Sequence, residues 1–120
     1  MSAAKRRVAL LTALLIVTTA QAADAVDEID FLASAVGSSG CTFIRNGKRH
    51  DAADAEAHLR MKYRRGKRYA PTAELFIERL ASRSSISNKP YYIECGDGEP
   101  VETGIWLTQR LEDYRSNGAG

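Results

Sequence analysis

The two cysteines constrain the fold more than any other feature of this chain. Each lies in a short β-branched and aromatic segment typical of a strand, Cys41 at the start of the first and Cys95 at the end of the second. If these strands run antiparallel with the cysteines opposite each other, the two-residue period of a strand decides which side chains share a face. The pairs on one face are then Cys41–Cys95, Phe43–Ile93 and Arg45–Tyr91. We expect helices to cover this face.

We predict that Cys41 and Cys95 form a disulfide bond. A reactive or metal-binding thiol pair is the alternative, but the chain has no C-x-x-C spacing and no histidine beside either cysteine. The bond would close a loop of about 55 residues and, on the loop-entropy argument, contribute about 4 kcal/mol. That is a large share of the roughly 5–15 kcal/mol by which a small domain is stable.

The N-terminal segment predicts export into the oxidising compartment that a disulfide requires. A basic stretch at residues 5–7 precedes an apolar run at 8–17 and an A-x-A site at 20–22. We therefore expect residues 1–22 to be a signal peptide that is removed after Ala22. Alternative cleavage positions follow Ala23 and Ala25. The apolar run is shorter than the roughly 20 residues of a membrane span, so we expect no span after cleavage and a periplasmic or secreted protein.

The remaining chain has the size of one small domain, residues 23–120, with a disordered polar tail expected over 116–120. Hydrophobic residues make up 44% and charged residues 27%, which excludes collagen-like, coiled-coil and polytopic membrane proteins. Removal of the three basic signal residues changes the formal net charge from +2 to −1. The charge is unevenly distributed, because the segment Arg45–Arg68 holds nine Lys and Arg against three Asp and Glu.

Hydrophobic periodicity and end signals predict four helices, over residues 24–36, 51–65, 72–81 and 103–115. The expected N-caps are Asp24, Asp51, Thr72 and Thr103. The dipeptide Asn46-Gly47 predicts a hairpin turn from the first strand into a short polar edge strand. The expected fold class is therefore α+β, with about four short helices packed on a two- or three-stranded antiparallel sheet.

Four strings of this sequence resemble a known family. They are SGCTFIRNG at 39–47, HLRMKY at 58–63, TAELFI at 72–77 and KPY at 89–91. Together they resemble a family of small exported bacterial proteins catalogued as domain of unknown function 5329, and the similarity runs from about Ile29 to Arg115. The resemblance implies a bacterial source and export. It implies no activity and supplies no catalytic residues.

The strongest functional signal is a run of six basic residues at the end of the second predicted helix and in the turn after it. They are Arg60, Lys62, Arg64, Arg65, Lys67 and Arg68. Such a run is commonly a solvated helix face, and the dipole favours cations at a helix C-terminus. The functional interpretation is an anion-binding patch, because Arg suits phosphate and carboxylate groups and Tyr63 and Tyr69 can stack on a ring. The expected partner is an anionic envelope component or an acidic protein, not nucleic acid.

Two other classes of function are alternatives, a small hydrolase and a metal-binding protein. A hydrolase would use His58 as its base, with His58 or His50 in a cleft and within hydrogen-bond reach of a serine hydroxyl or a carboxylate. A metal site would use Asp54 and His58, which are one helical turn apart, but no third strong ligand is evident. We therefore assign no catalytic residue, metal ligand or cofactor, and predict a non-enzymatic binding or interaction module.

Overall fold

The computed structural model describes residues 17–117, and the predicted signal peptide lies outside the described residues as far as residue 16. The first helix, α1 (Val17–Gly37), begins before the predicted start and runs through Asp24, so the prediction that Asp24 caps it is wrong. The segment 17–23 contains no glycine or proline that would end a helix. The face of α1 that enters the core consists of Ile29, Leu32, Ala33 and Val36.

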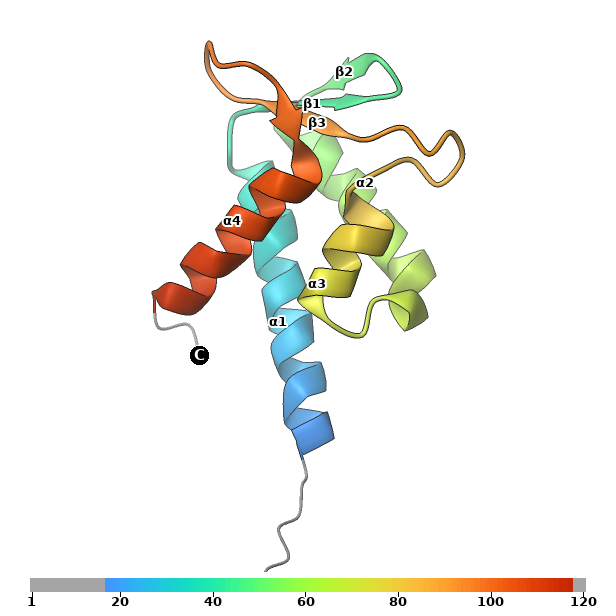
Figure 1. Cartoon of the computed structure of the whole chain (residues 1–120), viewed down its shortest axis with the longest axis vertical. Helices are drawn as coiled ribbons and strands as arrows, with labels where there is room; N and C mark the ends of the chain where they lie inside the picture. The colour runs from blue at the N-terminus through green and yellow to red at the C-terminus, as the bar shows by residue number, and fades with distance from the viewer. Residues whose placement is uncertain (1–16, 118–120) are drawn as a thin grey trace, which may run out of the picture.

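Four strands form one antiparallel sheet in the order β2-β1-β3-β4 (Figure 1). Their bounds are β1 Thr42–Arg45, β2 Lys48–His50, β3 Tyr92–Glu94 and β4 Val101–Glu102. Phe43 pairs with Ile93, which confirms the predicted register. The β1–β2 turn is the predicted one, since Asn46 and Gly47 both have the positive φ that a two-residue hairpin turn requires.

The fourth strand exceeds the predicted two or three. β4 has two residues, Val101 and Glu102, and both are exposed. A strand this short offers no alternation of buried and exposed side chains, so no sequence pattern marks it. The fold class is nevertheless the predicted one, an antiparallel sheet with four α-helices.

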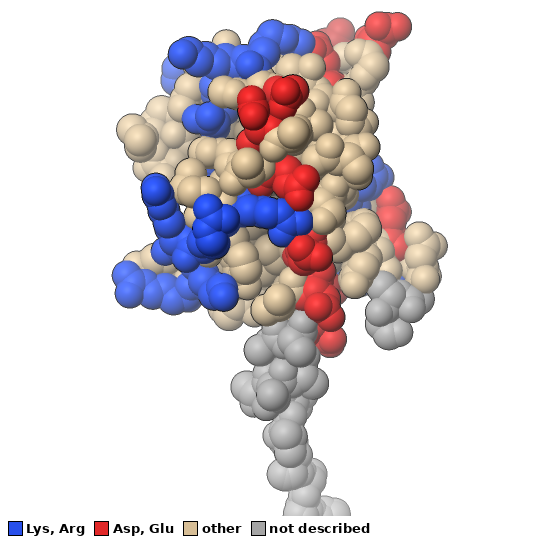
Figure 2. Space-filling view, turned by 180° about the vertical axis from the view of Figure 1, so that it is seen from behind, with Lys and Arg blue, Asp and Glu red and all other residues tan. Residues whose placement is uncertain are grey.

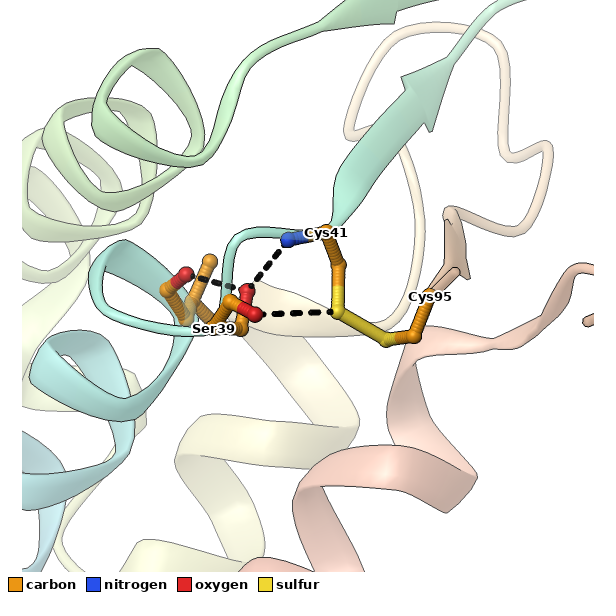
Figure 3. The surroundings of a disulfide bond; sticks show 4 residues. Ser39, Cys41 and Cys95 are labelled. Atoms are coloured by element: carbon orange, nitrogen blue, oxygen red, sulfur yellow. Dashed lines mark hydrogen bonds between the residues drawn. A yellow bond between two sulfur atoms is a disulfide. The ribbon is translucent and has the colours of Figure 1, made fainter. Parts of the chain in front are cut away.

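A disulfide joins Cys41 and Cys95 across the β1–β3 pair, as predicted (Figure 3). Ser39 organises the turn before it, because its Oγ donates to the carbonyl of Val36 at 2.7 Å and accepts from the backbone N of Cys41 at 3.0 Å. The Cys41 Sγ also lies 3.6 Å from the Ser39 carbonyl oxygen. A disulfide sulfur carries no proton, so this last approach is a contact and not a hydrogen bond.

The second helix, α2 (Ala52–Gly66), begins as predicted, with Asp51 Oδ1 accepting from the backbone N of Asp54 at 2.8 Å. The last residue of the helix is Gly66, and Leu80 approaches it closely. A Cβ on Gly66 would lie 2.9 Å from a terminal methyl of Leu80, which is closer than carbon atoms normally pack.

A short 3-10 turn, η1 (Lys67–Tyr69), leads to α3 (Ala73–Phe76), and a π-helical segment, η2 (Ile77–Ala81), continues α3. Thr72 is the predicted N-cap, and its Oγ1 accepts from the backbone N of Leu75 at 3.1 Å. The predicted third helix is therefore present, with a change of helical hydrogen bonding halfway along it.

The last helix, α4 (Thr103–Ser116), does not use Thr103 as its N-cap. Thr103 is the first helical residue and its side chain is fully buried, with no hydrogen-bond partner for its Oγ1 among the described residues. The cause is a tertiary contact, because the Thr103 backbone N donates to the carbonyl of Tyr91 at 2.9 Å. This bond docks the start of α4 onto the chain next to β3.

The helices pack below the sheet, with α1 in the centre, α4 on one side and α2 and α3 on the other (Figure 1). The largest fully buried side chains come from every layer and include Leu32, Phe43, Leu59, Phe76, Tyr91 and Leu107.

Arg115, near the end of α4, forms ion pairs at 2.7 Å with both Glu28 of α1 and Glu74 of α3. Within the described part of the chain, no helix is long and apolar enough to cross a membrane.

Candidate functional site

The six residues of the predicted basic run do not share one environment. Arg60 pairs with Asp30 of α1 and with Glu56, one turn earlier on α2, at 2.8 Å each. Lys62 and Arg65 line a cavity beside the sheet. The other three, Arg64, Lys67 and Arg68, are exposed and do not line that cavity.

Charged side chains are distributed unevenly on the face drawn in Figure 2. Lys and Arg gather toward one side of this face, and Asp and Glu form a band down its middle. Arg60 has acidic neighbours, because its guanidinium bridges Asp30 and Glu56. Arg60 is thus already neutralised within the fold.

The cavity has a volume of about 400 Å³ and lies among β1, α2, η1 and the loop 82–90. We call it the Lys62 cavity. Its lining residues are Arg45, Asn46, His58, Met61, Lys62, Arg65, Gly66, Tyr69, Leu80, Ser84, Ser85, Ile86 and Tyr91. Three of these are Arg or Lys and none is Asp or Glu. The cavity is therefore a cationic site with apolar and aromatic walls.

Lys62 is the most unusual of the lining residues, because only 9% of it is exposed. It follows Leu59 by three positions and precedes Gly66 by four, so all three fall on the buried face of α2. Its Nζ donates to the Tyr91 hydroxyl and to the carbonyl of Arg83, both at 3.0 Å. Among the described residues it has no carboxylate partner. Burial, with a smaller contribution from the nearby Arg45, lowers the pKa of Lys62 to about 8.

Tyr91 connects Lys62 to His58. Its buried hydroxyl lies 3.0 Å from the Lys62 Nζ and 3.2 Å from the His58 Nε2. Because an ammonium can only donate, the Tyr91 hydroxyl accepts from Lys62 and keeps its own proton to donate to His58. This assignment puts the proton of a neutral His58 on its Nδ1. Burial raises the pKa of Tyr91 despite the opposing effect of Arg45, so the phenol stays protonated.

His58 is neutral at pH 7. Burial is the main reason that its pKa is lowered to about 4, and repulsion by Arg45, Lys62 and His50 acts in the same direction. It lies in a cleft, as the hydrolase hypothesis requires, but its hydrogen bond goes to a phenol and not to a serine hydroxyl or a carboxylate. The buried Ser84 uses its Oγ to accept from the backbone N of Ile86 and Ser87. These contacts do not form the nucleophile–base pair of a hydrolase.

Arg45 contributes a second desolvated cationic group to the cavity. Its Nε is buried and has no hydrogen-bond partner among the described residues. A buried donor without a partner costs about 1–3 kcal/mol, and more when it is charged. Arg45 and Lys62 both line the cavity.

The structure does not place Asp54 and His58, the two candidate metal ligands, in a site with a third ligand among the described residues. No group of three or more His, Cys, Asp or Glu side chains is placed to hold an ion in the described part of the chain. Asp54 is exposed in the first turn of α2, and the His58 Nε2 is engaged with Tyr91.

Arg45 and Tyr91 are site residues that the sequence analysis did not single out. A signal for them was present, because the register predicted from the cysteines places Arg45 opposite Tyr91 on the helix-covered face. An arginine and a tyrosine facing the interior of a small domain need polar partners there. Lys62 and His58 provide part of that environment.

The pKa of His58 leads to a prediction about acid stability. The unfolded chain takes up a proton near pH 6.5, whereas native His58 resists protonation down to about pH 4. The free energy of unfolding therefore falls as the pH drops through this window, and the His58 contribution is about 1–3 kcal/mol. Urea unfolding at pH 7 and pH 4 measures it. A His58→Gln variant should lose less stability than the wild type, and equal losses would contradict the assignment.

Comparison with known proteins first shows the family of this chain and then a relative of it. A model of the family of unknown function DUF5329 matches residues 23–115, so this chain belongs to that family. One curated relative is the uncharacterized protein YfeK of Salmonella typhimurium (strain LT2), 48% identical over 50 residues. The match spans 42% of this chain and 42% of that protein. No solved structure matches the chain.

Proposed function

We propose that this protein is exported and binds an anionic group in the Lys62 cavity. The observation that carries the proposal is the buried ammonium of Lys62, which has two neutral hydrogen-bond partners and no carboxylate partner among the described residues. Burying an ammonium costs several kcal/mol unless an opposite charge lies beside it. A bound anion supplies that charge.

The composition of the cavity favours a compact anion such as a phosphate or a carboxylate. Arg45 and Arg65 offer planar donor groups, and Lys62 adds a point charge. The volume of about 400 Å³ suits one charged group with a small body, not an extended polymer. The role is binding, with an anionic envelope component or an acidic side chain of a protein partner as the source of the charge.

Two observations support the exported location. The family match begins at Ala23, the residue expected to follow signal cleavage. A disulfide such as Cys41–Cys95 is typical of proteins in an oxidising compartment.

The net charge of the mature chain bears on the kind of ligand. A chain with a net charge of −1 suits a local anion site better than the extended phosphate backbone of a nucleic acid.

Inorganic phosphate tests the cavity directly. Melting temperatures are measured in phosphate and in chloride at equal ionic strength, so that general screening is the same. We expect phosphate to raise the melting temperature of the wild type by about 5–10 °C at ten times its dissociation constant. A Lys62→Met variant should lose this increment while melting no lower than the wild type in chloride, because the substitution removes an unpaired buried charge.

Two charge-matched triple variants separate the cavity from general basicity. One carries Arg45→Gln, Lys62→Met and Arg65→Gln, and the other carries Gln in place of Arg64, Lys67 and Arg68. Both lose three positive charges, but only the first loses the cations that line the cavity. We expect the second variant to keep the phosphate increment. A wild-type increment no larger than that of Lys62→Met, or loss of the increment in the second triple variant, would refute the proposal.

A further inference from the structure

We propose that the Lys62 cavity docks the protein onto an anionic phospholipid surface, with a lipid phosphate among the cavity cations and Ile86 inserted between the lipid chains. The inference rests on the proposed function and deepens it, because it names the source of the anion. It is carried by an observation independent of the cations, namely where the exposed apolar side chains lie.

Ile86 is 97% exposed, whereas the next most exposed isoleucine of the described residues, Ile105, is 57% exposed. An isoleucine side chain that stays almost wholly in water buries no apolar surface on folding, so it adds no hydrophobic stabilisation to the fold. Ile86 also lines the Lys62 cavity, and so does Tyr69, another exposed large hydrophobic side chain. The rim of the cationic cavity thus carries an aliphatic and an aromatic side chain, both open to solvent.

Ile86 lies in the loop 82–90, which projects beside the sheet (orange in Figure 1). Hydrogen bonds within this loop fix the position of Ile86. The Ser84 Oγ accepts from the backbone N of Ile86 and of Ser87, at 3.1 Å each. The Ser84 backbone N donates to the carbonyl of Lys89 at 2.9 Å, and an isolated bridge pairs Arg83 with Pro90. These bonds close the base of the loop and present its tip to solvent.

Exposed cations lie in this loop and on the hairpin beside it. Arg83 and Lys89 are exposed at the base of the loop, and Lys48 is exposed on the neighbouring hairpin. The loop and the hairpin are linked, because the Ser87 Oγ donates to the Asn46 Oδ1 at 2.5 Å. The loop that carries Ile86, Arg83 and Lys89 therefore adjoins the hairpin that carries Lys48, and both border the cavity through Ile86 and Asn46.

This arrangement matches the layers of an anionic membrane interface. Basic side chains are attracted to lipid phosphates near the surface, tyrosines favour the headgroup level, and apolar side chains favour the acyl boundary. A single apolar anchor binds only marginally, so stable attachment needs a second contribution. The Lys62 cavity supplies that second contribution, and a soluble anion would leave Ile86 without a role.

Vesicle binding tests the inference with the protein recovered after export. Co-sedimentation with phosphatidylglycerol vesicles is compared with phosphatidylcholine vesicles at low salt. We expect binding to the anionic vesicles only. Ile86→Ser should weaken this binding by about tenfold, as expected for partial loss of one buried aliphatic side chain. Ile105→Ser, the same change at an exposed isoleucine outside the cavity, should bind like the wild type.

The phosphate melting assay makes the outcomes distinguishable. Ile105→Ser, outside the cavity, should keep the full phosphate increment, and Lys62→Met should lose both the increment and the vesicle binding. A wild-type protein that responds to phosphate but ignores the vesicles binds a soluble anion, and the docking proposal is then wrong. Docking is equally wrong if Ile86→Ser and Ile105→Ser bind alike. Vesicle binding without any phosphate increment would overturn both proposals.

Discussion

Replacing Phe43 by alanine is expected to lower the free energy of unfolding by about 3–5 kcal/mol. Phe43 is 1% exposed, and its ring centroid lies 5.2 Å from that of Tyr91. It also pairs with Ile93 in the centre of the sheet. The substitution would leave a cavity bounded by the sheet and the helices, and neither side can collapse without breaking strand pairing. Urea unfolding monitored by circular dichroism measures the change.

The matched control is Phe31→Ala. Phe31 is only partly buried and packs on Tyr114 with a ring-centroid distance of 4.4 Å. Water can occupy the space left by this ring, so the loss should be smaller, about 1–2 kcal/mol. If both substitutions cost the same, the β1–β3 pair is not the centre of the core.

Removal of the disulfide should have an effect of similar size. The bond links residues 54 positions apart, and a loop of that length contributes about 4 kcal/mol on the chain-entropy model. We expect a Cys41→Ser, Cys95→Ser double variant to lose about this much stability and to melt well below the oxidised protein.

Reduction of the wild type is the control for the disulfide prediction, because it breaks the same bond without changing the side chains. The reduced wild type and the double variant should unfold at similar urea concentrations. If the reduced protein is as stable as the oxidised one, the β1–β3 pairing holds the two ends together without the bond and the entropy argument fails.

The sheet was largely predictable because one covalent constraint decides its register. Once Cys41 and Cys95 are opposite each other, Phe43 can face only Ile93, and the structure confirms this. The Asn46-Gly47 turn is equally local, since the residues themselves favour the positive φ that the turn needs. The N-caps at Asp51 and Thr72 are local in the same sense.

The features that were missed depend on contacts between distant parts of the chain. Thr103 resembles an N-cap in sequence but is drawn into the core by the bond between its backbone N and Tyr91. Lys62 was expected at a basic helix end, yet its burial depends on Tyr91 and Arg83, which lie more than twenty positions further on. Helical periodicity records which residues share a face and does not reveal what that face meets.

The three-way contact of Arg115 joins the end of α4 to α1 and α3. Its pairs with Glu28 and Glu74 hold the last turn of α4 against α1 only a few residues after the expected mature N-terminus. In Figure 1 α1 begins at the bottom and α4 ends at the left, both away from the sheet and the loop 82–90. A surface tether attached at the start of α1 or at the end of α4 would therefore lie far from this loop, which leaves the loop open for binding measurements.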